Sequence, residues 1–379
     1  MALEHCKWDP QMGDICTISA FPLILDANNW RILARLSERL TAELSDAESE
    51  LLHRPELLGQ LGLPAWIRSA LAEYRRPDVE ARAGRVMRFD FHWTRNGWAV
   101  SEVNRDVPGG FAEASELPAL MEPHSLGARA VERPGDLLAD ALSATSDGRV
   151  VALLAASGYL EDHQVVAYLS QLLIRRGVPC VRLTPEQLAW RDGNACLQKP
   201  GGEIAIGAIF RFYQAEWLHP TSTGPRLFAS RTPVCNPCTA ALTESKRLPL
   251  AWPRLSARMT TWRSVLPETR DPREVDWQRN HCWVLKPAYG NTGDDVLMHR
   301  GEFEREWARL TKDVRRRPDR WIAQRRFESD GIDTPIGPVH PCIGVYTIDG
   351  RAAGIYGRYS TEALIDWKAV DVAVLVEER

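Results

Sequence analysis

Polar residues at alternating positions mark two segments that could bind a metal ion. Arg88 and Asp90 lie two residues apart in RVMRFDFHW, and Glu102 and Asn104 lie two residues apart in GWAVSEVN. Alternate residues of a β-strand face the same side, so each pair shares one face of its strand. Two carboxylates and an amide oxygen are ligands suited to Mg²⁺. If the two strands pair in the right register, these residues predict a magnesium site on a β-hairpin.

The register of this hairpin decides whether the polar residues meet. A two-residue turn would place Asp90 opposite Val103 and would scatter the polar side chains over both faces. A three-residue loop, with Gly97 in the left-handed conformation, places Asp90 opposite Glu102 and aligns the other polar pair as well. We predict the second register because it gathers one site; the alternative is a half-solvated hairpin whose polar face only meets water. The residues of the opposite face are apolar and predict a core beneath it: Met87, Phe89, Phe91 and Trp93.

A second segment, WVLKPAYGNTGDDVL, could bind phosphate groups. Lys286 ends an apolar strand, and Gly290 and Gly293 follow in a polar loop. Such a loop can cover phosphates with backbone N–H groups while the lysine meets their charge, although an ordinary turn has the same composition. The segment is neither a P-loop nor a GxGxxG dinucleotide motif. Near the C-terminus, Arg358 in GIYGRYS could hold a carboxylate or an acyl phosphate, or could form only a surface ion pair.

Composition restricts the classes of protein. The 379 residues carry a formal net charge of -3 with basic and acidic residues interspersed, which argues against a nucleic-acid partner. The N-terminus has no signal-peptide pattern and no apolar run approaches a membrane span, so we expect a cytoplasmic protein without a membrane partner. Cys235 and Cys238 form the only CxxC pair among eight cysteines, and we interpret them as incidental thiols in a proline-containing loop.

The order of expected elements divides the chain into three parts. Residues 1–147 combine N-terminal helices with the metal-ligand hairpin; only a short helical region precedes Arg85, so we expect no amidase domain there. Residues 148–239 begin with a strand, a helix closed by Gly177 and a second strand, which is the pattern of a parallel α/β unit. Residues 240–379 are expected to be rich in strands, with a charged helix at 302–317 and a hairpin turn at Asp349-Gly350.

These motifs, in this order, resemble the ATP-grasp synthetase domain of the glutathionylspermidine synthase family. The family's R-x-D motif, with E-x-N twelve residues after the aspartate, is matched at 88–90 and 102–104. WVLKPAYGNTG looks like the family's phosphate-covering loop, and RWIAQRRFE and DGRAAGIYGR look like its late hinge and substrate segment. FRFYQAEWL is similar to another family segment. The metal ligands precede the lysines, as in the family's permuted order. The resemblance implies an α/β (α+β) fold of the ATP-grasp type in permuted order, with an inserted Rossmann-like parallel unit, the pre-ATP-grasp domain.

The resemblance also implies roles for individual residues. It implies Mg²⁺ and ATP as cofactors, with the bridging metal ions bound by Asp90, Glu102 and Asn104. Charge on the transferring phosphoryl group and the carboxylate would be stabilised by Arg88 and Arg358. The nucleotide-binding residues would be Lys246, Lys286, Gly290, Gly293 and Gln324, with the glutamine near the adenine.

The implied activity is an ATP-dependent ligase that joins a carboxylate, of an amino acid or a peptide, to an amine through an acyl phosphate. The sequence departs from the family at Val107, which replaces a serine or threonine, and at its short C-terminal ending, so glutathione and spermidine are not expected as substrates. Two alternatives remain open, a catalytically inactive ATP-binding regulatory protein and an ATP-dependent kinase. Neither substrate nor the oligomeric state is predicted.

Overall fold

The computed structural model describes residues 1–2, 4–12, 15–73, 85–218, 223–290, 296, 304–363, 365 and 368–378. Within these ranges the helices are α1 Ala27–Leu52, α2 Ala65–Glu73, α3 Phe111–Met121, α4 Pro134–Ser146, α5 Leu160–Arg175, α6 Gly224–Phe228, α7 Ala241–Glu244, α8 Leu248–Ala251, α9 Thr260–Val265 and α10 Glu304–Arg316. The strands are β1 Gln11–Met12, β2 Ile15–Cys16, β3 Leu23–Leu25, β4 Val86–Thr94, β5 Gly97–Asn104, β6 Ala128–Arg129, β7 Val150–Ala155, β8 Cys180–Leu183, β9 Ala189–Arg191, β10 Asn194–Lys199, β11 Gly202–Phe212, β12 Val234–Cys235, β13 Thr269–Arg270, β14 Trp283–Pro287, β15 Trp321–Arg325, β16 Ile332–Thr334, β17 Gly337–Ile348, β18 Arg351–Ser360, β19 Val370–Val372 and β20 Val374–Glu377.

The central sheet is built from two segments that are far apart in the sequence. Its strand order is β19-β18-β17-β4-β5, with β16 also paired to β17, and these pairings are antiparallel. The hairpin of β17 and β18 turns at Asp349-Gly350, where both residues have positive φ, as the sequence predicts. The β4–β5 hairpin, which carries the predicted metal ligands, therefore lies beside the C-terminal hairpin that carries Arg358.

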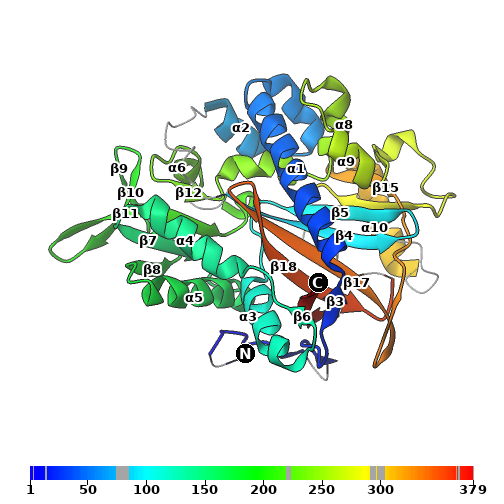
Figure 1. The fold of residues 1–379 in the computed structure, drawn as a ribbon. Coiled ribbons are helices and arrows are strands. Elements are labelled where there is room, and N and C mark those ends of the chain that lie inside the picture. Colours follow the sequence, from blue (N-terminus) through cyan, green and yellow to red (C-terminus); the bar gives the residue numbers. More distant parts are fainter. Residues whose placement is uncertain are drawn as a thin grey trace.

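The long helix α1 covers the apolar face of this sheet (Figure 1). It begins at the N-cap Asp26, whose carboxylate accepts hydrogen bonds from the backbone N–H groups of Asn28 and Asn29. Leucines at helical spacing along α1 share one buried cluster with Phe89 and Phe91 of β4, as predicted for this face. Trp93 is the exception to that prediction: it is 39% exposed at the end of β4 and packs edge-on against Trp98.

The predicted pairing of the metal-ligand hairpin is confirmed, but the turn that produces it is different. Asp90 pairs with Glu102, and Arg88 pairs with Asn104. The strands are joined by a two-residue turn between Thr94 and Gly97. Asp90 pairs with Glu102 whereas Phe91 pairs with Val100, so one residue of β5 is left unpaired. That β-bulge, at Ser101, brings the four polar residues back onto one face.

A second sheet lies beside the first and contains the parallel unit expected from the sequence. Its order is β8-β7-β11-β10-β9, with β12 also paired to β11. Strands β8, β7, β11 and β12 are parallel, whereas β9 and β10 add an antiparallel extension that was not predicted. Helices α4 and α5 pack on this sheet (Figure 1). The boundaries of this unit at 147/148 and 239/240 remain predictions.

Three smaller sheets complete the fold of the described residues, and the smallest is the antiparallel pair of β1 and β2. Strands β13, β15 and β14 form one antiparallel sheet next to α10, and β3, β20 and β6 form another that joins the two ends of the chain. The strand β14 carries Lys286 and the strand β15 carries Gln324. Among the described residues, no helix combines the length and apolar character that crossing a membrane requires.

Candidate functional site

Three of the predicted charged residues meet on the face of the central sheet opposite α1: Arg88, Asp90 and Arg358. A row of paired residues crosses this face: Asp90 on β4 pairs with Gly344 on β17, which pairs with Tyr356 on β18. A side chain at the central position would collide with its neighbours, because an added Cβ would lie 2.9 Å from Cδ of Arg88. Glycine therefore leaves a notch in the sheet between Asp90 and Tyr356. Two guanidinium groups occupy this notch.

Asp90 is the common partner of the groups in the notch. Its carboxylate accepts hydrogen bonds from Nε and Nη2 of Arg88 at 2.8 and 3.1 Å. It also accepts one from Arg358 at 2.9 Å and a longer one from the amide of Asn104 at 3.3 Å. Burial raises the pKa of the Asp90 carboxyl, but the charges of Arg88 and Arg358 outweigh burial and hold that pKa below its ordinary value. Asp90 is therefore a buried carboxylate that keeps its negative charge.

A second charged cluster lies on the neighbouring strand. Nζ of Lys246 is 3.3 Å from a carboxylate oxygen of Glu102 and donates to the carbonyl oxygen of Gly290 at 2.8 Å. Nζ of Lys286 donates to the carbonyl oxygen of Ser101 at 3.2 Å. Burial lowers the pKa of Lys286 to about 8; Glu102 opposes this shift and the charge of Lys246 adds to it. Two lysines and one carboxylate thus meet beside the bulge in β5.

Lys246 and Lys286 line a pocket that combines charged and apolar residues. Gln324 lies in its wall, with the side-chain amide donating to the hydroxyl of Thr269 at 3.1 Å. The charged residues of the lining are Glu102, Glu244, Lys246 and Lys286, and its apolar wall includes Leu44, Val103, Leu248, Pro249, Trp252, Trp262, Leu266 and Ile322. Such a lining can take a ligand that is anionic at one end and flat and apolar at the other.

The predicted site residues therefore fall into two adjoining groups. Arg88, Asp90, Asn104 and Arg358 meet in the notch, whereas Glu102, Lys246, Lys286 and Gln324 line the pocket. The groups adjoin because Asp90 and Glu102 are paired across β4 and β5. Gly290 contacts Lys246, and Gly293 lies outside the described residues.

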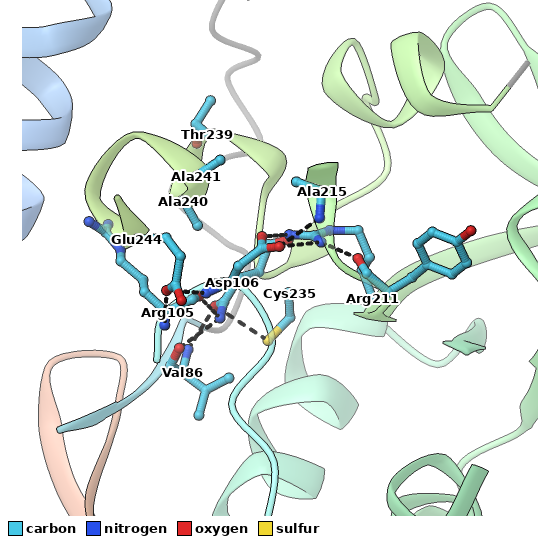
Figure 2. A network of polar contacts seen from close by, with 12 residues as sticks. Val86, Arg105, Asp106, Arg211, Ala215, Cys235, Thr239, Ala240, Ala241 and Glu244 are labelled. Carbon is cyan, nitrogen blue, oxygen red and sulfur yellow. Dashed lines mark hydrogen bonds and ion pairs between the residues drawn. The ribbon is translucent and has the colours of Figure 1, made fainter. Parts of the chain in front are cut away.

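Glu244 is a pocket residue that the sequence analysis missed. Its carboxylate accepts hydrogen bonds from the backbone N–H groups of Arg105 and Asp106 at 2.6 and 3.1 Å, directly after the last residue of β5 (Figure 2). Burial raises its pKa to about 7. Glu244 therefore ties the strand of the metal-ligand hairpin to the segment that carries Lys246. A single glutamate at the end of the four-residue helix α7 gives no periodic signal from which this contact could be predicted.

A buried ion pair connects the same turn to the parallel unit. Arg211 on β11 donates to both carboxylate oxygens of Asp106, and the same carboxylate accepts the backbone N–H of Ala215 at 2.7 Å (Figure 2). Asn236, next to β12, bonds to the backbone N–H of Val86 at 2.9 Å. Cys235 and Cys238 are both buried and free. The polar network holds the hairpin against the second sheet.

Comparison with known proteins gives the fold and the family. No curated protein matches this sequence. A glutathione synthetase-like effector from Globodera pallida in its apo form has a similar structure, with a TM-score of 0.62 at 13% identity over 94% of this chain and 89% of the other. A gamma-glutamylcysteine synthetase described as putative, from Methylobacillus flagellatus, gives a TM-score of 0.46 at 13% identity over 90% and 85% of the two chains.

The family match covers most of the sequence. The profile of the glutathionylspermidine synthase pre-ATP-grasp family matches residues 25–376. The architecture agrees with it: an α/β fold of the ATP-grasp type in permuted order, whose β4–β5 hairpin precedes the strand that carries Lys286 and which contains an inserted parallel unit. A match of this length shows that the chain belongs to the glutathionylspermidine synthase pre-ATP-grasp family.

Proposed function

We propose that this protein is an ATP-dependent ligase that joins the carboxylate of an amino acid or peptide to an amine through an acyl phosphate. The observation that carries the proposal is the position of the notch with its two arginines beside a pocket that contains two lysines and an apolar wall. Phosphoryl transfer needs positioned positive charge more than a side-chain nucleophile. The family to which the chain belongs supports a ligase of the glutathionylspermidine synthase type.

The pocket would hold the nucleotide. Lys246 and Lys286 are both in its lining, where their ammonium groups would bind the phosphates. Gln324, Trp252 and Trp262 lie in the same lining, and flat apolar walls suit a purine base.

The oxygen atoms next to the pocket suit Mg²⁺. Asp90, Glu102 and Asn104 would hold it, and the ion would neutralise charge that develops on the phosphates. Asp90 and Glu102 are paired across β4 and β5, and the nucleotide phosphates would complete the coordination. Few protein ligands are what Mg²⁺ commonly uses at nucleotide sites, where it keeps waters and substrate oxygens.

The arginines of the notch would act on the transferring group. A carboxylate oxygen of the substrate would attack the γ-phosphorus, and ADP would leave with the electrons of the broken P–O bond. Arg88 and Arg358 would stabilise the negative charge on the transferring oxygens. Among the described residues, Nε of Arg358 has no hydrogen-bond partner although it is buried, so a donor is available for such an oxygen. The amine would then attack the acyl carbon, phosphate would leave, and the nitrogen would lose a proton.

The proposal is tested by measuring ADP release and hydroxamate formation together. The purified protein would be supplied with Mg-ATP, a panel of amino acids and peptides, and either a panel of amines or hydroxylamine. An acyl phosphate reacts with hydroxylamine to give a hydroxamate, whereas the product of a hydroxyl kinase does not. ADP release with hydroxamate supports the ligase; ADP release with a phosphorylated product and no hydroxamate identifies a kinase. Nucleotide binding without turnover on any pair identifies an inactive binding protein.

The lowered pKa of Lys286 predicts how nucleotide binding depends on pH. Above pH 8 Lys286 of the free protein loses its ammonium charge. The dissociation constant for Mg-ATP is therefore expected to rise by up to roughly tenfold per pH unit, until the pH reaches the pKa of Lys286 in the nucleotide-bound protein. The nucleotide phosphates are already ionised in this range. Calorimetric titrations at pH 7.0, 8.0, 9.0 and 9.5 measure this effect. Lys286→Met should bind more weakly at pH 7 and should lose the dependence; a wild-type affinity that stays constant to pH 9.5 would contradict the assignment.

A further inference from the structure

Tyr356 lies against both arginines of the notch. Its ring centroid is 5.0 Å from Cζ of Arg88 and 5.4 Å from Cζ of Arg358. The ring is 9% exposed, so these cation–π contacts are largely shielded from water. The two guanidinium groups are thus enclosed by the carboxylate of Asp90 on one side and an aromatic face on the other.

The notch carries one more positive charge than negative charges, and the ring stabilises this excess. Two guanidinium groups share the single carboxylate of Asp90 there, and like charges at short distance repel in a buried site. The negative face of an aromatic ring attracts cations without adding a formal charge. A second carboxylate would neutralise the arginines and weaken their pull on a phosphate. Tyr356 can therefore hold both groups while the notch keeps one net positive charge.

The ring itself is fixed by a network that begins in the N-terminal segment. The hydroxyl of Tyr356 donates to a carboxylate oxygen of Asp371 at 2.6 Å, and the other oxygen of Asp371 is 3.0 Å from Nζ of Lys7. Lys7 is 5% exposed and also contacts Asp9 and Glu113 at 3.1 and 2.9 Å. A buried lysine with three carboxylate partners is held in one position. It holds Asp371, and through Asp371 it holds the ring.

The ring also packs closely against the backbone at Gly110. An added Cβ on Gly110 would lie 3.1 Å from Cζ of Tyr356 and 3.1 Å from the hydroxyl oxygen of Tyr346. Gly110 has a φ of 87° and precedes α3, so the chain turns directly against the two tyrosines. The carbonyl oxygen of the neighbouring Gly109 accepts a hydrogen bond from Arg88 at 2.8 Å. Ring and guanidinium are therefore fixed by the same turn.

We propose that Tyr356 is a positioning residue for Arg88 and Arg358, and that Lys7 and Asp371 lock it in place. The inference rests on the proposed function, because the arginines are there assigned to phosphoryl transfer. Tyr356 acts through the arginines and not on the substrate. The ring, more than the hydroxyl, carries the effect, since the ring makes both cation contacts. Misplacement of reacting groups by about 1 Å can cost on the order of 100-fold in rate.

The kinetic test compares three variants. Tyr356→Leu removes the ring and is expected to lower kcat for ADP release by roughly 30- to 100-fold, with KM for ATP changed less than about threefold, since the lysine pocket is intact. Tyr356→Phe keeps the ring and should retain kcat within about fivefold. Tyr359→Leu is the matched control, because Tyr359 is a buried tyrosine on the same strand that stacks on Phe21 and faces away from the notch. Equal losses in Tyr356→Leu and Tyr359→Leu would overturn the inference.

A spectroscopic test does not depend on turnover. The Nε–H signals of Arg88 and Arg358, assigned from Arg88→Lys and Arg358→Lys, should carry a ring-current shift in the wild-type protein. Tyr356→Leu should remove that shift for both arginines. Tyr356→Phe loses the hydrogen bond to Asp371, so it and Lys7→Met should both keep the shift but broaden the signals as the ring becomes mobile. Unchanged signals in Tyr356→Leu would overturn the inference whether or not the protein is a ligase. Normal signals with no ADP release from any substrate pair would reject the proposed function instead.

Discussion

Replacing Asp90 with asparagine is expected to lower Mg-ATP-dependent ADP release by at least about 1000-fold, because one substitution removes a proposed metal ligand and the charge partner of two arginines. Asparagine keeps the shape of the side chain but cannot balance a guanidinium group. Arg88 and Arg358 would then repel each other across the notch and would bind the substrate carboxylate or phosphate without turnover. Steady-state assays measure the loss of ADP release, and calorimetric titration measures whether Mg-ATP still binds.

The same substitution should also destabilise the fold, so a control is needed. Removing one partner of a buried ion pair costs about 3–5 kcal/mol in general. Asp333 is an exposed aspartate on β16 of the same sheet, and Asp333→Asn should change neither activity nor melting temperature. Activity of Asp90→Asn should be compared at a temperature where circular dichroism shows that it is folded. A folded Asp90→Asn protein with more than a tenth of the wild-type activity would contradict the role assigned to Asp90.

Replacing Asp106 with asparagine is expected to lower stability by about 3–5 kcal/mol, or roughly 4–6 °C in melting temperature for a chain of this length. The reason is that the side chain of Arg211 is fully buried, and Asp106 is its carboxylate partner in the network that holds the hairpin against the second sheet (Figure 2). Thermal unfolding followed by circular dichroism measures the change. Asp192→Asn, at an exposed turn position with positive φ in the same unit, is the matched control.

A double substitution separates the charge effect from the loss of contacts. Asp106→Leu with Arg211→Leu removes both charges, whereas Asp106→Leu alone leaves a buried cation without its partner. The double variant should therefore be more stable than Asp106→Leu. If Asp106→Leu and the double variant melt at the same temperature, the network does not hold the two sheets together through this ion pair.

The register of the β4–β5 hairpin could be predicted because its polar residues alternate with the period of a strand. Alternate polar residues must lie on one face of a strand, and one register alone gathers them. The bulge at Ser101 could not be predicted, because an extra residue in a strand leaves no mark in composition. The sequence analysis therefore predicted the correct pairing from a three-residue loop, whereas the structure has a two-residue turn and a bulge.

The residues that support the site were harder to predict from the sequence. Gly344 stands inside a strand of apolar residues, and a glycine in that position is a sign of close approach by another group. Tyr356 lies two residues before Arg358, so the period of the strand places both on one face. However, an aromatic residue in a buried strand is predicted to be part of the hydrophobic core. Glu244 and the pocket tryptophans come from short helices around 241–266 that have no long periodicity.

The central claim, that the protein activates a carboxylate as an acyl phosphate, is tested most directly by following oxygen. A carboxylate substrate found in the ADP-release screen would be labelled with ¹⁸O in its carboxyl group and incubated with Mg-ATP and the amine, and the released phosphate would be analysed by mass spectrometry. The account predicts one ¹⁸O atom in each phosphate, because the carboxylate oxygen that attacks the γ-phosphorus leaves with it when the amide forms. Product formation with unlabelled phosphate would contradict the account.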